Sequence, residues 1–199
     1  KRLDVSDSQQ VDRCFSEVSD QHGSLDIVVN NAGVGQVVTP IVELDDREWD
    51  RVIKITLTGA FYCCRAAGRI MERQESGRIV NIASIAGKEG FPNLAHYSAS
   101  KFAVVGFTNA LAKEVARDGI TVNAICPGIV RTYMWDRLSD EWKAEGESVE
   151  DSWSRHQLTL IPQGRAQTPE DMGRMALFFA TMDNVTGQSV NVDGGFTFH

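Results

Sequence analysis

Tyr97 and Lys101 are the residues of this sequence whose types and spacing best suit proton transfer. They lie four positions apart in a segment of helical character, so both side chains project from one face of the helix. A free tyrosine has a pKa of about 10, and a nearby ammonium group favours the phenolate and lowers that pKa. The pair can therefore act as a general acid and base near neutral pH. The spacing alone is common on helices, where an exposed lysine beside a half-buried tyrosine is the usual explanation.

Ser84 supplies a hydroxyl group thirteen residues before Tyr97, in a loop of small residues that follows the apolar run 78–82. A hydroxyl group in this place can hold and polarise a substrate oxygen. Ser84, Tyr97 and Lys101 are therefore the candidate catalytic residues.

The segments that must position these residues alternate between short apolar runs and longer amphipathic stretches. Such alternation predicts βαβ units in a parallel α/β sheet with right-handed crossovers. The nearly all-apolar run 25–30 is typical of a strand buried on both faces. Ligands bind beyond the carboxyl ends of such strands, so we expect the site at loops 30–35, 83–92 and 126–135. The expected strands lie at 25–30, 78–82, 120–125 and 189–192, with a strand end at 3–5, and the expected helices lie between 6 and 23, over 46–71 and 95–117, and from Pro169 onward.

The composition is that of a globular domain and argues against several classes of function. The 199 residues are 42% hydrophobic and 24% charged, and we expect one domain over 1–199. A formal charge of -7 argues against nucleic acid or an anionic membrane surface as a partner, and no apolar run approaches the ~18 residues of a membrane span. The four cysteines form no CxxC pair and the four histidines are scattered. We therefore predict no metal site and a reducing, cytoplasmic setting.

Six motifs occur in an order that resembles the short-chain dehydrogenase/reductase family over nearly the whole chain. The resemblance implies a single Rossmann-type, doubly wound α/β domain and an NAD(P)-dependent alcohol dehydrogenase or ketone reductase acting on a small molecule, in which the cofactor carries the hydride. The motifs are NNAG at 30–33, GRIVNIAS at 77–84, YSASK at 97–101, VNAICPG at 122–128, GR at 164–165 with TPED at 168–171, and the segment from TGQ to DGG at 186–195.

The resemblance implies a role for each matched residue. Tyr97 is the general acid in carbonyl reduction and the general base in alcohol oxidation. Lys101 lowers the pKa of Tyr97 and binds the nicotinamide ribose, and Ser84 holds the substrate oxygen. The cofactor is NAD or NADP, with NAD slightly favoured. The residues expected to contact it are Asp4, Val5, Asn31, Ala32, Gly33, Tyr97, Lys101, Pro127, Gly128, Val130 and Thr132.

Two features depart from the family's pattern. The glycine-rich dinucleotide fingerprint is absent, and the family layout places roughly 50 to 65 residues before Lys1. We therefore expect the chain to be N-terminally incomplete and to lack the first two strands. The helix over 46–71 carries Thr56 where many members have an asparagine that supports a water-linked proton path to the lysine. Thr56 bears on the rate of turnover, and a tolerated substitution is the simpler explanation.

Substrate specificity is expected to come from the loop after Ser84 and from residues 133–160, an irregular helical insertion that we call the lid. The lid holds three of the four tryptophans. Met134 and Trp135 could wall a small pocket, and His96 beside Tyr97 could reach a substrate hydroxyl, although packing is the more frequent role of such aromatic residues. We expect a small diol, polyol or hydroxyketone as the substrate, while a bulkier ketone, a steroid or a 3-oxoacyl group stays open.

The helices expected over 46–71 and 95–117 keep apolar residues on more than one face, which predicts that a second face is buried. Related proteins pair these helices across two-fold axes, so we expect a homotetramer. The alternative function is that of a non-catalytic or truncated relative that serves as an oligomerisation or binding module. The intact set of Ser84, Tyr97 and Lys101 favours the enzyme, and binding of NAD(H) or NADP(H) separates the two functions.

Overall fold

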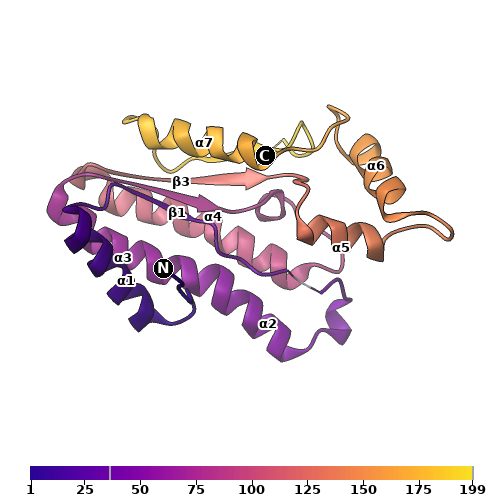
Figure 1. The fold of residues 1–199 in the computed structure, drawn as a ribbon, viewed down its shortest axis with the longest axis horizontal. Coiled ribbons are helices and arrows are strands. Elements are labelled where there is room, and N and C mark those ends of the chain that lie inside the picture. Colours follow the sequence, from indigo (N-terminus) through magenta and orange to yellow (C-terminus); the bar gives the residue numbers. More distant parts are fainter. Residues whose placement is uncertain (36, 199) are drawn as a thin grey trace.

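The computed structural model describes residues 1–35 and 37–198, except for the side chain of Tyr133, and arranges them around a four-stranded parallel sheet (Figure 1). Ile79 lies in register between Val28 on one neighbouring strand and Val122 on the other. The predicted parallel α/β sheet is confirmed. The strands follow in the spatial order β1 (Ile27–Asn30), β2 (Gly77–Ile82), β3 (Ile120–Pro127) and β4 (Ser189–Val192).

Seven α-helices flank these strands within the described residues. They are α1 (Ser8–His22), α2 (Asp46–Val52), α3 (Gly59–Gln74), α4 (Ala95–Val115), α5 (Tyr133–Glu141), α6 (Val149–Leu160) and α7 (Pro169–Thr181). Shorter helical segments are the 3-10 turns Ile41–Glu43, Ile85–Gly87 and Ala116–Asp118 and the π-helix Ile53–Thr58.

The helices form two layers around the sheet, with α1, α3 and α4 on one face and α7 on the other (Figure 1). Successive strand residues point to opposite faces, so neighbouring positions enter different layers. Ile79 packs with the layer of α3 and α4, whereas Val80 and Ile125 pack against Phe179 of α7. The core therefore lies on both faces of β2 and β3, which fixes these two central strands.

The edge strand β1 differs from its prediction. Ile27 is 50% exposed and Val29 is 46% exposed, so β1 is not buried on both faces. The reason is that α7 packs mainly against β2, β3 and β4. The strand end predicted at residues 3–5 is also wrong, since this segment has no strand beside it in the described chain to supply ladder hydrogen bonds. Leu3 and Val5 pack instead with Cys63 near α3.

The long helix predicted over 46–71 is interrupted by a π-helix. Helix α2 leads directly into Ile53–Thr58, and α3 continues from Gly59. A side chain at Gly59 would bring its Cβ within 2.8 Å of Val5, so glycine permits this close approach. Thr56 is buried at 3% exposure within the π-helical turn. Such turns are frequent at functional sites.

The helical insertion predicted at 133–160 is confirmed as α5 and α6, which lie at one end of the molecule, beyond the carboxyl ends of the strands (Figure 1). The ring of Trp135 packs edge-on against Trp142 and Trp153, with centroids 5.9 and 6.1 Å away. Glu150 at the start of α6 accepts a hydrogen bond of 2.9 Å from Arg131, which precedes α5. Arg131 also pairs with Asp136 of α5, so aromatic contacts and ion pairs join the two lid helices.

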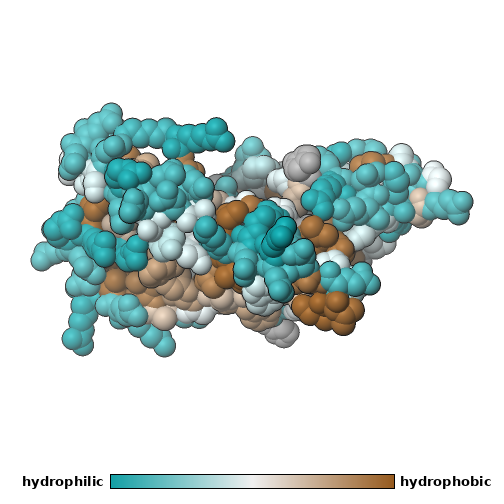
Figure 2. Space-filling view, turned by 90° about the horizontal axis from the view of Figure 1, so that it is seen from below, coloured by the Kyte–Doolittle hydropathy of each residue, from teal (hydrophilic) through white to brown (hydrophobic). Residues whose placement is uncertain are grey.

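The surface seen from the side of α2 alternates between hydrophilic and hydrophobic patches (Figure 2). Phe61 on α3 and Phe102 on α4 are 39% and 45% exposed, so both helices carry apolar side chains that the described chain leaves uncovered. None of the described helices combines the length and the apolar character that crossing a membrane requires.

Candidate active site

One cavity of about 870 Å³ lies where the carboxyl ends of β1, β2 and β3 meet the lid. Asn31 follows β1, Ser84 follows β2, and Gly128 follows β3, and all three line this cavity. Because parallel strands end at the same edge of the sheet, segments far apart in the sequence meet there. The loops predicted to carry the site therefore come together.

Ser84 is held rigidly at the end of β2. The N–H of Ala83 donates a 2.7 Å hydrogen bond to the carbonyl of Ile125, which extends the ladder between β2 and β3 by one residue. The Ser84 hydroxyl accepts a 3.1 Å hydrogen bond from the N–H of Ala86, and Ser84 is only 8% exposed. This hydroxyl therefore has a fixed position on the wall of the cavity.

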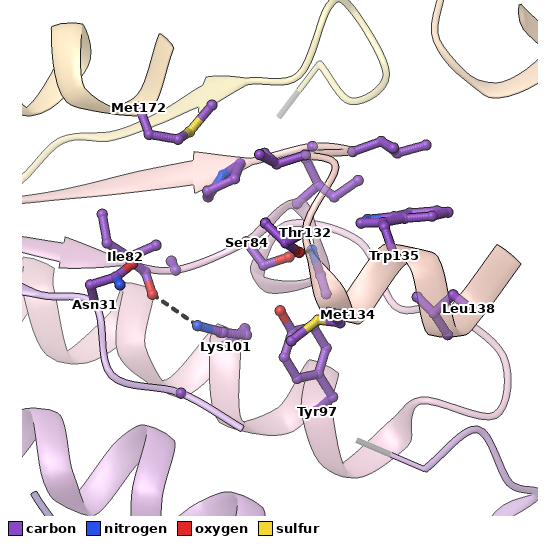
Figure 3. A pocket seen from close by; sticks show the side chains of 18 of the residues that line it. Asn31, Ile82, Ser84, Tyr97, Lys101, Thr132, Met134, Trp135, Leu138 and Met172 are labelled. Carbon is purple, nitrogen blue, oxygen red and sulfur yellow. Dashed lines mark hydrogen bonds between the residues drawn. The ribbon is translucent and has the colours of Figure 1, made fainter. Parts of the chain in front are cut away.

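Tyr97 lies in the first turn of α4, and its hydroxyl group points toward the hydroxyl group of Ser84 (Figure 3). Burial raises the pKa of Tyr97, and the hydrogen bond with Ser84 opposes that rise. At neutral pH the phenol therefore keeps its proton and is ready to donate it.

Lys101 donates a 2.8 Å hydrogen bond from its ammonium group to the carbonyl of Ile82, one turn of α4 beyond Tyr97 (Figure 3). It lies 5.7 Å from the centroid of the Tyr97 ring. Burial dominates at the Tyr97 phenol, and the ammonium group of Lys101 is directed at Ile82, so the expected lowering of the Tyr97 pKa by Lys101 stays a prediction. Burial lowers the pKa of Lys101 itself to about 8, with a small opposing influence from Cys126.

Thr56 from the π-helix lines the same cavity as Lys101. Its hydroxyl group is buried and has no hydrogen-bond partner among the described residues. A buried polar group without a partner is costly, so this hydroxyl is suited to a water molecule or a ligand.

The structure divides the residues expected to contact a cofactor into two groups. Those that line the cavity are Asn31, Gly33, Tyr97, Lys101, Pro127, Gly128, Val130 and Thr132. Three do not line it: Asp4, Val5 and Ala32. Asp4 instead accepts a 2.9 Å hydrogen bond from the N–H of Ser6, and Val5 packs against Gly59.

The residues of the cavity fit the nicotinamide end of a dinucleotide. Hydrogen-bonding side chains from four separate segments, Asn31, Thr56, Lys101 and Thr132, line it together. A side chain at Gly33 would meet nothing within 4 Å, so the backbone there borders open space. A flat ring with an attached sugar therefore finds both room and polar partners on this side.

His96 does not occupy the place expected of a substrate contact. Met134 and Trp135 line the cavity as predicted, but His96 is fully buried and does not line it. Its Nε2 lies 3.9 Å from Glu48, which Arg51 holds by hydrogen bonds of 2.7 and 2.8 Å. Successive helix residues point about 100° apart because a turn takes 3.6 residues, so His96 faces away when Tyr97 faces the cavity.

Several residues of the cavity were not named individually from the sequence, although six of them lie in the predicted loop 83–92 or in the lid. Most are apolar, and they come from the loop after Ser84, from the lid and from the C-terminal part of the chain, where periodicity gives no signal for a shared cavity. They are Ile85, Phe91, Leu94, Leu138, Trp142, His156, Leu160, Met172 and Phe196.

Comparisons with known proteins agree with this geometry. A family model described as enoyl-(acyl carrier protein) reductase matches residues 1–197. The chain is 40% identical over 199 residues to a 3-oxoacyl-[acyl-carrier-protein] reductase of Chlamydia pneumoniae, which covers 99% of this chain and 75% of the relative.

Two solved structures share the fold. Actinorhodin polyketide ketoreductase with NADPH has a TM-score of 0.92 at 38% identity, covering 98% of this chain and 76% of that one. NAD+-bound xylitol dehydrogenase has a TM-score of 0.90 at 29% identity, covering 97% and 77%. Since the family model spans nearly the whole chain and the ordered motifs meet at one cavity, the chain belongs to the short-chain dehydrogenase/reductase family of NAD(P)-dependent oxidoreductases.

Proposed function

We propose that Tyr97 exchanges a proton with the oxygen of an alcohol or ketone while Ser84 holds that oxygen. The observation that carries this proposal is the meeting of the two hydroxyl groups on one cavity wall beneath the lid (Figure 3). A carbonyl oxygen between them can accept two hydrogen bonds, one of which becomes the proton transfer.

The protein contributes proton supply and orientation to the reaction. The nicotinamide cofactor, when bound, supplies or accepts the hydride. Asn31, Lys101 and Thr132 are the polar residues suited to hold it. In reduction the Tyr97 phenol, which is protonated at neutral pH, donates its proton to the substrate oxygen. A protonated Lys101 beside the ring stabilises the phenolate left behind.

The proposed substrate is a small, uncharged hydroxyketone, diol or polyol. Lys101, the only Lys or Arg side chain among the described residues that line the cavity, already donates to a backbone carbonyl, so no free cation awaits an anionic group. The similarity to xylitol dehydrogenase supports a polyol, whereas the similarity to acyl-carrier reductases supports a longer ketone.

The proposed cofactor is NAD in preference to NADP, and the proposed assembly is a cytoplasmic homotetramer. The NAD+ bound to the xylitol dehydrogenase supports the first choice, and the NADPH of the polyketide ketoreductase is the competing choice. Exposed Phe61 and Phe102 on α3 and α4 support burial of these helices between subunits. Light scattering tests the assembly, and a monomer at micromolar concentration contradicts it.

The function is tested by following oxidation of NADH and NADPH with diacetyl, acetoin and a longer 3-oxo ester as substrates. We expect Ser84→Ala to lower kcat by about 10²-fold, as loss of a group that stabilises developing charge does. Ser76→Ala changes an exposed serine between α3 and β2 and serves as the matched control. Equal turnover in Ser84→Ala and in the unaltered chain would contradict the role of Ser84.

A further inference from the structure

We propose that His156 binds a second, uncharged oxygen of the substrate at the lid end of the cavity. The preferred substrate is then a ketone or secondary alcohol whose apolar body carries another hydroxyl or carbonyl group away from the reacting carbon. This inference rests on the proposed function of the same cavity and adds the residue that would select among its substrates.

Aromatic rings fix His156 in the wall of the cavity. The imidazole centroid lies 5.7 Å from the ring of Trp142 and 6.2 Å from that of Trp135. All three residues line the cavity, and His156 is only 7% exposed. Because Trp142 follows α5 and His156 belongs to α6, the contact between them joins the two lid helices at this point.

The two nitrogens of the imidazole differ in their surroundings. The Nδ1 atom lies 3.4 Å from the hydroxyl oxygen of Ser152, four residues earlier on α6, and Ser152 is fully buried. The Nε2 atom has no hydrogen-bond partner among the described residues. It is not fully buried, so it retains access to open space. A nitrogen of this kind on a cavity wall is available to a ligand.

The charged groups near His156 are paired with each other. Arg155 donates a 2.9 Å hydrogen bond to Glu147 and a second of 3.1 Å to the carbonyl of Trp142. Burial lowers the pKa of His156 and the charge of Arg155 lowers it further, against smaller rises from a hydrogen bond with Ser152 and from the charge of Glu147. The imidazole is therefore neutral at pH 7, and a neutral imidazole recognises a hydroxyl or carbonyl oxygen better than a carboxylate.

Apolar side chains line much of the cavity that His156 shares with the reacting hydroxyl groups. Met134 and Leu138 project from α5 along the cavity beyond Tyr97 (Figure 3), and Leu94 and Phe196 line it too. An unbranched sugar chain would leave its hydroxyl groups unpaired along this wall, which is costly, so among the proposed substrates the inference favours a hydroxyketone or diol over a polyol. A hydrocarbon body with one oxygen at each end satisfies both the wall and His156.

The test uses matched ketones with the full chain. Cyclohexanone and decalone are each compared with an analogue that bears a hydroxyl group opposite the carbonyl. One hydrogen bond is worth about tenfold in affinity, so we expect kcat/KM about tenfold higher for the hydroxyl-bearing ketones, mainly through KM. In His156→Phe, which keeps an aromatic ring but has no nitrogen, this ratio falls to about one. The ratio within one variant cancels any general loss of activity.

Two variants and a second readout make the result decisive. His156→Gln returns a hydrogen-bonding group and is expected to recover part of the ratio, while His22→Phe at the exposed end of α1 keeps all of it. Binding of the same ketones is also measured by quenching of tryptophan fluorescence, which needs no turnover. A ratio that persists in His156→Phe by both readouts overturns the inference. Absence of turnover with a binding ratio that His156→Phe abolishes overturns the proposed function and leaves the inference standing.

Discussion

Ser84, Tyr97 and Lys101, which we call the strand-end centre, line the same cavity as the lid. Different interactions hold these two regions in place. Ser84 and Lys101 are at most 8% exposed and are fixed by backbone ladders and by a helix buried against the sheet. The lid is joined by aromatic contacts and by ion pairs such as Arg131–Glu150, whose side chains are about half exposed. Exposed ion pairs contribute little to stability. We propose that the strand ends carry the proton chemistry and that the lid carries substrate selection.

Loss of the Tyr97 hydroxyl is the most severe test of the centre. We expect Tyr97→Phe to lower kcat by at least about 10³-fold, because the proton donor is removed while the ring and its packing remain. Activity is followed by the absorbance of the reduced cofactor, and cofactor binding by its fluorescence.

Tyr62→Phe on α3 removes a hydroxyl outside the cavity and is the matched control. If turnover survives in Tyr97→Phe, Tyr97 is not the proton donor, and the proposed division between a catalytic centre and a substrate-selecting lid is wrong.

Large-to-small substitutions should lower the free energy of unfolding much more in the sheet than in the lid. Ile125 of β3 is fully buried and packs against Phe179, so Ile125→Ala should lower the free energy of unfolding by about 2–5 kcal/mol. Leu158→Ala changes a lid residue that is 72% exposed, and we expect a change within about 0.5 kcal/mol. Urea denaturation measures both variants. Equal losses would mean that the lid and the sheet are equally fixed.

The same contrast explains what could be predicted from the sequence. Ser84, Tyr97 and Lys101 could be predicted because their places depend on a strand end and on one helix face. Short-range spacing in the sequence indicates both. The prediction for His96 was wrong because adjacent helix residues point in different directions. Tyr97 points into the cavity, so His96 does not.

Long-range packing accounts for the remaining differences. Val5 packs on α3 in place of lining a cofactor site, because its surroundings depend on a segment more than fifty residues away. His156 gave no signal, since its role depends on aromatic contacts with Trp135 and Trp142 that no period reports. The exposure of β1 was not predicted, because an apolar run shows that a strand can be buried. It does not show whether another element covers that strand.

The lowered pKa of Lys101 predicts opposite effects of pH on activity and stability. Ketone reduction should fall about tenfold per pH unit above about 8, as the ammonium group loses its proton. The usual pKa is 10.5, so between about 8 and 10.5 the unfolded chain binds more protons and stability rises with pH. Rate profiles and denaturation measured at each pH check both signs.

Lys101→Arg provides the control for this profile, since a guanidinium group keeps its charge and should shift the alkaline fall in activity to higher pH. A fall near pH 8 that is the same in Lys101→Arg would assign it to another group.

Thr56 tests the centre on a smaller scale. Thr56→Val keeps the shape and removes a buried hydroxyl that has no partner in the described chain, so stability should change by less than about 1 kcal/mol. If this hydroxyl holds a water molecule beside Lys101, kcat should fall about threefold to tenfold. Thr58→Val, in the same π-helix and outside the cavity lining, is the comparison variant. Loss of stability without loss of kcat would make Thr56 a packing residue.

The smallest effect is expected at the ion pair that bridges the lid helices. Glu150→Gln removes one charge from the contact with Arg131 and should leave the thermal midpoint unchanged, because water screens both side chains. The variant should raise KM about twofold by loosening α6 against α5, and kcat should stay constant, because the groups at the strand ends do not move. Glu141→Gln breaks the Arg137–Glu141 pair within α5 alone and should leave KM unaltered. A change in kcat for Glu150→Gln would show that the lid helps to position the reacting groups, and the division between chemistry and selection would then lie inside the lid.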